Sequence, residues 1–160
     1  MDLLGIGSET VHMGWQGVKR KDWLDELCDI WPHERFCFDR CAGGLNTKDY
    51  SSLIQRSKIV LNLRGHGDYT FKLFEFLYLQ CCIVSQPLQR AVNYGGVPIG
   101  VTMAESPSGV MKRCVSLLEQ SKWFAKSKMS HQWYQNNYSE FALKLWADKT
   151  VLSIINSCGI

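Results

Sequence analysis

Residues 50–87 read YSSLIQRSKIVLNLRGHGDYTFKLFEFLYLQCCIVSQP and hold the clearest alternation of strand and helix patterns in the chain. Residues 58–63 (KIVLNL) and 82–85 (CIVS) are short apolar runs, which is typical of buried strands. Residues 71–79 fit a short, mostly buried helix. A strand, a helix and a strand in this order predict a parallel βαβ unit, with 58–63 at the centre of the sheet because it is apolar on both faces.

The same alternation continues outward in both directions. Toward the amino terminus we expect strands at residues 3–7 and 35–38, and helices at 15–28 and from Asn46 or Thr47 onward. Toward the carboxyl terminus we expect a loop over residues 86–100, a strand near 99–103, a helix starting at Ser106–Pro107, and helices over 122–137 and 139–156.

This pattern predicts one α/β domain over residues 1–160, a Rossmann-like three-layer sandwich with a parallel sheet and extra carboxyl-terminal helices. The length suits one domain, and 46% hydrophobic with 21% charged residues is typical of a soluble globular protein. No apolar run reaches the roughly 18 residues of a membrane span, and the amino terminus lacks a signal-peptide pattern. We therefore expect a cytoplasmic location. The net charge is +3 with scattered basic residues, which argues against a nucleic-acid partner.

The chain has seven cysteines, an odd number that cannot pair completely. We expect Cys81 and Cys82 to be buried, reduced thiols in a reducing compartment. A redox role for this adjacent pair is the weaker alternative, because neighbouring cysteines are poor disulfide partners. His33, Cys37 and Cys41 are spaced by four residues but lack the second ligand pair of a zinc site, so we expect no metal.

Polar and glycine-containing segments follow the predicted strands at their carboxyl ends, where parallel α/β sheets bind ligands. These segments are Gly7–Ser8, residues 64–69 and residues 85–90. A helix that opens near Thr70 favours an anion at its amino terminus. Lys72 adds a point charge suited to phosphate, and Glu75 lies nearly on the same helical face.

A carboxylate at Glu75 can accept hydrogen bonds from two vicinal ribose hydroxyls, so the pair would suit a nucleotide with a diphosphate. The alternative is a simple surface ion pair between Lys72 and Glu75, worth a few tenths of a kcal/mol. A lone histidine such as His66 is more often an ordinary loop residue than a catalyst.

These motifs resemble the donor-binding, carboxyl-terminal half of GT-B-type glycosyltransferases, including family 1- and family 4-like members. The resemblance rests on SKIVLNL, RGHGDYT, KLFE and FLYLQCCIVSQ, on DLLGIGS at the start, and on the stretch at 108–139. Residues 68–73 (DYTFKL) are also similar to a fucosyltransferase motif, one residue shorter.

The resemblance implies a nucleotide-sugar donor, with Glu75 on the ribose, Lys72 on the diphosphate, and no cofactor. The other implied donor-binding residues are Gly7, Ser8, Arg64, Gly65, Gly67, Tyr69 and Thr70, and His66 is the candidate general base. The sugar and the acceptor stay unassigned.

The chain also departs from the family pattern. Gly67 stands eight residues before Glu75, where retaining members often carry a first glutamate, and Gln80 replaces a usual glycine. Retention or inversion is therefore unassigned. A complete GT-B enzyme has two domains, so a second domain or subunit is expected to complete catalysis.

The alternative reading is a non-catalytic flavodoxin-like or Rossmann-like module that binds a nucleotide or a partner protein. Aromatic residues of the carboxyl-terminal helices would offer the partner surface if exposed. We expect them to pack inward instead, because aromatics at helical spacing usually do. They are Trp123, Trp133, Tyr134 and Trp146.

Overall fold

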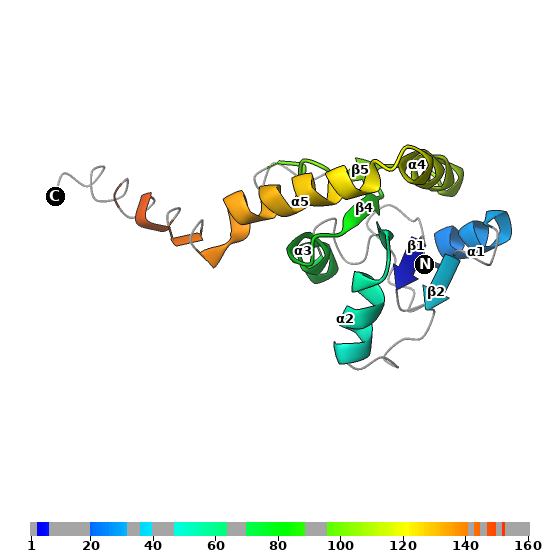
Figure 1. The fold of residues 1–160 in the computed structure, drawn as a ribbon, viewed down its shortest axis with the longest axis horizontal. Helices are drawn as coiled ribbons and strands as arrows, with labels where there is room; N and C mark the ends of the chain where they lie inside the picture. The colour runs from blue at the N-terminus through cyan, green and yellow to red at the C-terminus, as the bar shows by residue number, and fades with distance from the viewer. Residues whose placement is uncertain are drawn as a thin grey trace.

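The structure is a computed structural model, and it describes residues 3–6, 20–31, 36–39, 47–63, 70–88, 96–140, 143–144, 147–149 and 152. Strands and helices alternate through most of this part (Figure 1). In chain order the elements are β1 (Leu3–Ile6), α1 (Arg20–Ile30), β2 (Phe36–Asp39), α2 (Thr47–Gln55), β3 (Ile59–Asn62), α3 (Phe71–Tyr78), β4 (Cys82–Ser85), β5 (Thr102–Met103), α4 (Pro107–Glu119) and α5 (Trp123–Tyr138).

The strands form one parallel sheet of five strands in the order β2-β1-β3-β4-β5. Strand β3 lies at its centre, between β1, where Leu3 pairs with Ile59, and β4, where Ile59 pairs with Cys82. The prediction of a parallel α/β fold with β3 in the middle is therefore confirmed. All four residues of β3 and all four of β4 are buried, as expected for strands covered on both faces.

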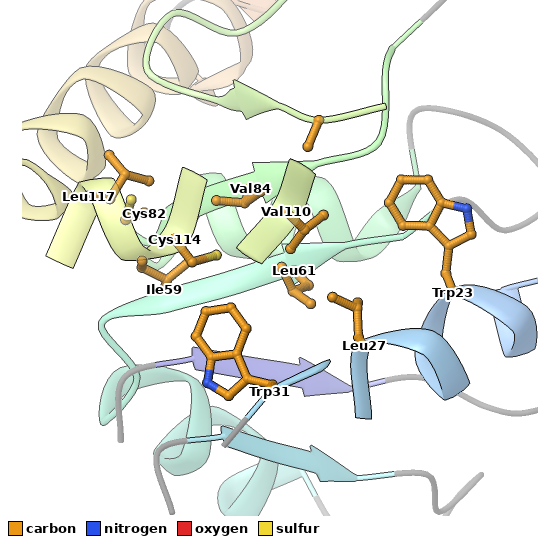
Figure 2. Close-up of a cluster of buried hydrophobic side chains, with 11 residues drawn as sticks. Trp23, Leu27, Trp31, Ile59, Leu61, Cys82, Val84, Val110, Cys114 and Leu117 are labelled. Atoms are coloured by element: carbon orange, nitrogen blue, oxygen red, sulfur yellow. The ribbon is translucent and has the colours of Figure 1, made fainter. Parts of the chain in front are cut away.

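Alternate residues of the two central strands enter two separate cores. On one face, Ile59 and Leu61 pack with Cys82 and Val84 against helices α1 and α4 (Figure 2). On the other face, Val60 and Ile83 belong to a cluster formed with helices α2, α3 and α5. The helices therefore cover both faces of the central strands. Full burial of each such aliphatic side chain contributes about 1.5–3 kcal/mol relative to exposure.

Side-chain caps set the start of two helices at the carboxyl edge of the sheet. Thr70 has extended backbone angles, and its hydroxyl accepts a hydrogen bond from the backbone N–H of Leu73, 3.4 Å away. Ser106 caps α4 in the same way through Gly109, and Pro107 occupies the first helical position. The sequence predicted a helix start at both positions.

Helix α5 approaches the sheet through small residues. Ser130 is fully buried, and its Oγ lies 3.0 Å from the carbonyl oxygen of Cys81 and 3.0 Å from that of Ser127, to which its hydroxyl donates. Gly100 has a φ of +100°, and a Cβ there would lie 2.6 Å from the backbone nitrogen of Ser130. Glycine is therefore needed at this contact for both its conformation and its lack of a side chain.

The prediction of a strand over residues 99–103 was too long, and Gly100 lies in the part that is not a strand. Residues 99–100 form a turn closed by a hydrogen bond from the N–H of Val101 to the carbonyl of Pro98 at 3.2 Å, so β5 starts only at Thr102. Helix α1 is observed at Arg20–Ile30 rather than 15–28, and residues 15–19 lie outside the described part. Of the predicted helix over 139–156, residues 140, 143–144, 147–149 and 152 are described as helical.

The adjacent thiols face opposite cores. Cys82 belongs to the cluster with α1 and α4, whereas Cys81 belongs to the cluster with α2, α3 and α5. Both are buried and neither is in a disulfide, which confirms their predicted burial. Desolvation raises the pKa of each thiol to about 12, so both are un-ionised at neutral pH.

The aromatic residues of α5 follow the predicted inward packing where they are described. Trp133 is buried, and Trp123 and Tyr134 are half-buried against the two cores. The side chain of Trp146 lies outside the described residues, as do those of His33, Cys37 and Cys41. Among the described residues, no helix has the length and apolarity to cross a bilayer, and no three potential metal ligands of the His, Cys, Asp or Glu type gather.

Candidate functional site

The chain reverses its direction of travel across the sheet between β1 and β3. From β1 it moves outward to β2, then returns to place β3 on the other side of β1 and continues to β4 and β5 (Figure 1). In open α/β sheets, ligands bind in the crevice outside the carboxyl ends of the strands at such a switch point. The segments that follow β1 and β3 therefore mark the candidate site.

Most of the predicted site residues belong to these two segments. Gly7 and Ser8 directly follow β1, and the loop over residues 64–69 follows β3 after Leu63. Gly7, Ser8, Arg64, Gly65, His66, Gly67 and Tyr69 all lie outside the described residues. Strands β1 and β3, which these two segments follow in the chain, are hydrogen-bonded neighbours in the sheet.

Helix α3 begins immediately after the second of these loops. Thr70 caps it, and Lys72 lies in its first turn with its side chain half-buried. The first N–H groups of any helix lack carbonyl partners within that helix, and the helix dipole adds positive potential there. The start of α3 and the Lys72 ammonium can therefore act together on an anion at the carboxyl edge.

Glu75 lies one turn further along α3 and is hydrogen-bonded to another helix. The hydroxyl of Tyr50 on α2 donates to Oε2 of Glu75 over 3.0 Å. Glu75 is exposed, whereas Tyr50 is half-buried against the core on that face. Burial, together with the Glu75 carboxylate, raises the pKa of Tyr50 well above its usual value, so its hydroxyl stays a donor across the physiological range.

Three buried polar residues are hydrogen-bonded to one another at this edge of the sheet. Nδ2 of Asn62 donates to Oγ of Ser85 at 2.9 Å, and that hydroxyl donates to the carbonyl of Gln86 at 2.7 Å. The backbone N–H of Gln86 donates to the carbonyl of Asn62 at 3.2 Å. All three residues are buried and stand at the carboxyl ends of β3 and β4, so they form a hydrogen-bonded polar cluster at this edge of the sheet.

Sequence reasoning did not single out Asn62 or the role of Tyr50. The signal for Asn62 was a lone amide within an otherwise apolar strand, directly before a glycine-containing loop. Such a side chain must find a partner when buried. Tyr50 gave no such signal, because its partner lies 25 residues away.

A cavity of about 320 Å³ lies at the opposite, amino-terminal end of β3 and β4. Its lining includes Lys58, Gln80, Cys81 and Trp123. With a pKa of about 12, the Cys81 thiol is a poor nucleophile there.

The chain matches no model of a known protein family, and no curated protein matches it.

Proposed function

We propose that the chain is a Rossmann-like, three-layer domain that binds a nucleotide-activated sugar, as the donor half of a GT-B-like glycosyltransferase. The observation that carries the proposal is the switch point between β1 and β3, with α3 opening beside it and carrying Lys72 and Glu75. The local sequence resemblance to GT-B donor domains supports the same assignment.

The proposed roles follow from the chemistry of each group. The start of α3, Lys72 and Arg64 would stabilise the nucleoside diphosphate as it leaves with growing negative charge. Glu75 would accept hydrogen bonds from the ribose hydroxyls. Gly7, Ser8, Gly65, Gly67, Tyr69 and Thr70 would line the donor site. His66 is the candidate base for the acceptor hydroxyl, because it is the one histidine of the loop after β3.

Transfer itself is proposed to need a second domain or subunit. In a two-domain architecture the reacting atoms lie in a cleft between the domains. A site open to water on one side loses most of its electrostatic stabilisation, because the effective dielectric constant stays high.

The binding experiment is a thermal-shift screen followed by calorimetric titration with ADP, GDP, UDP, CDP and their nucleotide sugars. A ligand at a hundred times its Kd should stabilise the fold by about 2.7 kcal/mol. Adenosine, guanosine, uridine and cytidine serve as controls for the diphosphate contribution. Absence of any stabilisation or heat with all of these ligands would overturn the proposal.

The strand order favours one alternative, a non-catalytic nucleotide- or partner-binding module. The order β2-β1-β3-β4-β5 is that of flavodoxin-like proteins, which also bind nucleotides at the β1–β3 switch point. Such a module would bind a nucleoside diphosphate with or without its sugar equally well. A donor domain is expected to bind the nucleotide sugar more tightly than a sugar-free analogue of equal charge.

A further inference from the structure

We propose that Tyr50 is a positioning residue that orients the Glu75 carboxylate toward a ribose diol and so selects ribonucleotides over 2′-deoxyribonucleotides. This inference rests on the proposed function, since it assigns a nucleotide to the same site. It adds Tyr50, from helix α2, to the site, and it adds a preference for ribonucleotides over 2′-deoxyribonucleotides.

The geometry supplies a fixed anchor and an accessible acceptor. Tyr50 stands near the start of α2, and its half-buried ring packs against the core shared with α3. Its hydroxyl holds Oε2 of Glu75 at 3.0 Å. Glu75 is an exposed residue, so a ligand can reach its side chain.

The number of acceptor sites suits a vicinal diol. An ionised carboxylate offers about four lone-pair sites, and one hydrogen bond from Tyr50 leaves about three. Two hydroxyls on neighbouring ribose carbons can use two of them.

Without this anchor, an exposed glutamate has three side-chain torsions to fix when the ribose binds. Ordering such a side chain costs free energy that weakens binding. The penalty applies to contacts with the diol and leaves the contact between the diphosphate and Lys72 unchanged. The loss should therefore be larger for a ribose with both hydroxyls than for a 2′-deoxyribose.

The competing explanation is a purely structural tether between α2 and α3. Loss of a tether would lower the free energy of unfolding and weaken all ligands by the same factor. Loss of a positioning contact would change the ratio of the Kd values for the 2′-deoxyribo and ribo forms, which is the readout chosen for the test.

The test compares the full chain with Tyr50→Phe, Glu75→Gln and the double variant by calorimetric titration. ADP, GDP, UDP and CDP are compared first. The diphosphate that binds most tightly and its 2′-deoxy counterpart are then the two probes. We expect the parent to prefer the ribo form by about tenfold, and Tyr50→Phe to reduce that preference to about two- to threefold. The double variant should resemble Glu75→Gln alone, because Tyr50 acts through Glu75.

Tyr78→Phe is the matched control, since Tyr78 is an exposed tyrosine on α3 itself and should leave the preference unchanged. If Tyr50→Phe keeps the parent's preference while binding persists, the positioning role is wrong and the donor site stands. If the parent binds none of the diphosphates, the proposed function and this inference both fail.

Discussion

Gly100 contacts the backbone of Ser130 so closely that a Cβ on the glycine would lie 2.6 Å from the serine nitrogen and 2.7 Å from the carbonyl oxygen of Lys126. Real Cβ atoms do not approach backbone atoms at such distances. The loop before β5 and helix α5 are thus in direct backbone contact, on the face where Ser130 also bonds to the carbonyl of Cys81.

Gly100→Ala is therefore expected to destabilise the fold by about 2–4 kcal/mol, combining a strained positive φ with overpacking. Urea denaturation followed by circular dichroism measures the change in the free energy of unfolding. Gly96→Ala is the matched control: its φ is +94°, but nothing lies within 4 Å of the added Cβ. It should cost about 1 kcal/mol from the backbone alone. Equal losses in both variants would show that the contact with α5 contributes nothing.

Stability should fall as the pH rises above 9. In the unfolded chain Cys81 and Cys82 ionise near their ordinary pKa of 9.0, whereas in the folded chain they ionise near 12. Between these values the folded state binds more protons, so the free energy of unfolding decreases with rising pH. Each thiol contributes a slope of up to about 1.4 kcal/mol per pH unit.

Urea titrations at pH 8, 9, 10 and 11 measure that slope. Cys82→Ala should flatten it by at least the contribution of one thiol, because Cys82 also raises the pKa of Cys81. Cys82→Ala also leaves a cavity, but this loss is present at every pH and does not alter the slope. A parent protein whose free energy of unfolding stays constant from pH 9 to 11 would contradict the assigned burial of the thiols.

Lys72→Ala and Glu75→Gln should affect different parts of a nucleotide. Loss of the Lys72 ammonium removes a charge-assisted phosphate contact, so a nucleoside diphosphate should bind about tenfold more weakly or worse, with little change for the nucleoside. Glu75→Gln should weaken the nucleoside as well. Lys112→Ala, at an exposed position on α4, controls for net charge. If Lys72 and Glu75 form only a surface ion pair, both variants will bind as the parent does.

The purified chain should show little or no sugar transfer to a simple acceptor. Binding without turnover is the result expected from the proposed donor half acting alone, because its site would be open to water on one side. Product formation from a radiolabelled nucleotide sugar, resolved by chromatography, is the measurement, with heat-denatured protein as the blank. Steady turnover above the blank would contradict the need for a second domain or subunit.

The central elements could be predicted from the sequence because local signals agree there. The run at 58–63 is apolar and β-branched, and Thr70 and Ser106 cap helices where the periodicity changes. The prediction for β5 was too long because residues 99–100 form a turn in which Gly100 has a positive φ and lies against α5, and the local apolar pattern did not reveal this contact.

Long-range pairs of side chains were beyond sequence reasoning for the same reason. Residues 50 and 75 both carry hydrogen-bonding groups, but only the packing of α2 beside α3 on one face of the sheet brings Tyr50 to Glu75. The hydrogen bond from Asn62 to Ser85 likewise depends on the register of β3 with β4. The positions of Gly7, Ser8 and the loop over 64–69 stay predictions, since those residues lie outside the described part.

Because Cys81 and Cys82 belong to different cores, the reactivity of each thiol can be used to measure local opening of its own core. Both thiols line the cavity at the amino-terminal end of β3 and β4, but each is packed into a different core. Reaction with a bulky disulfide reagent therefore requires movement of the elements that pack against that thiol. The ratio of the two labelling rates, read from adjacent positions in one peptide, thus compares how often each half of the protein opens while the sheet between them remains intact.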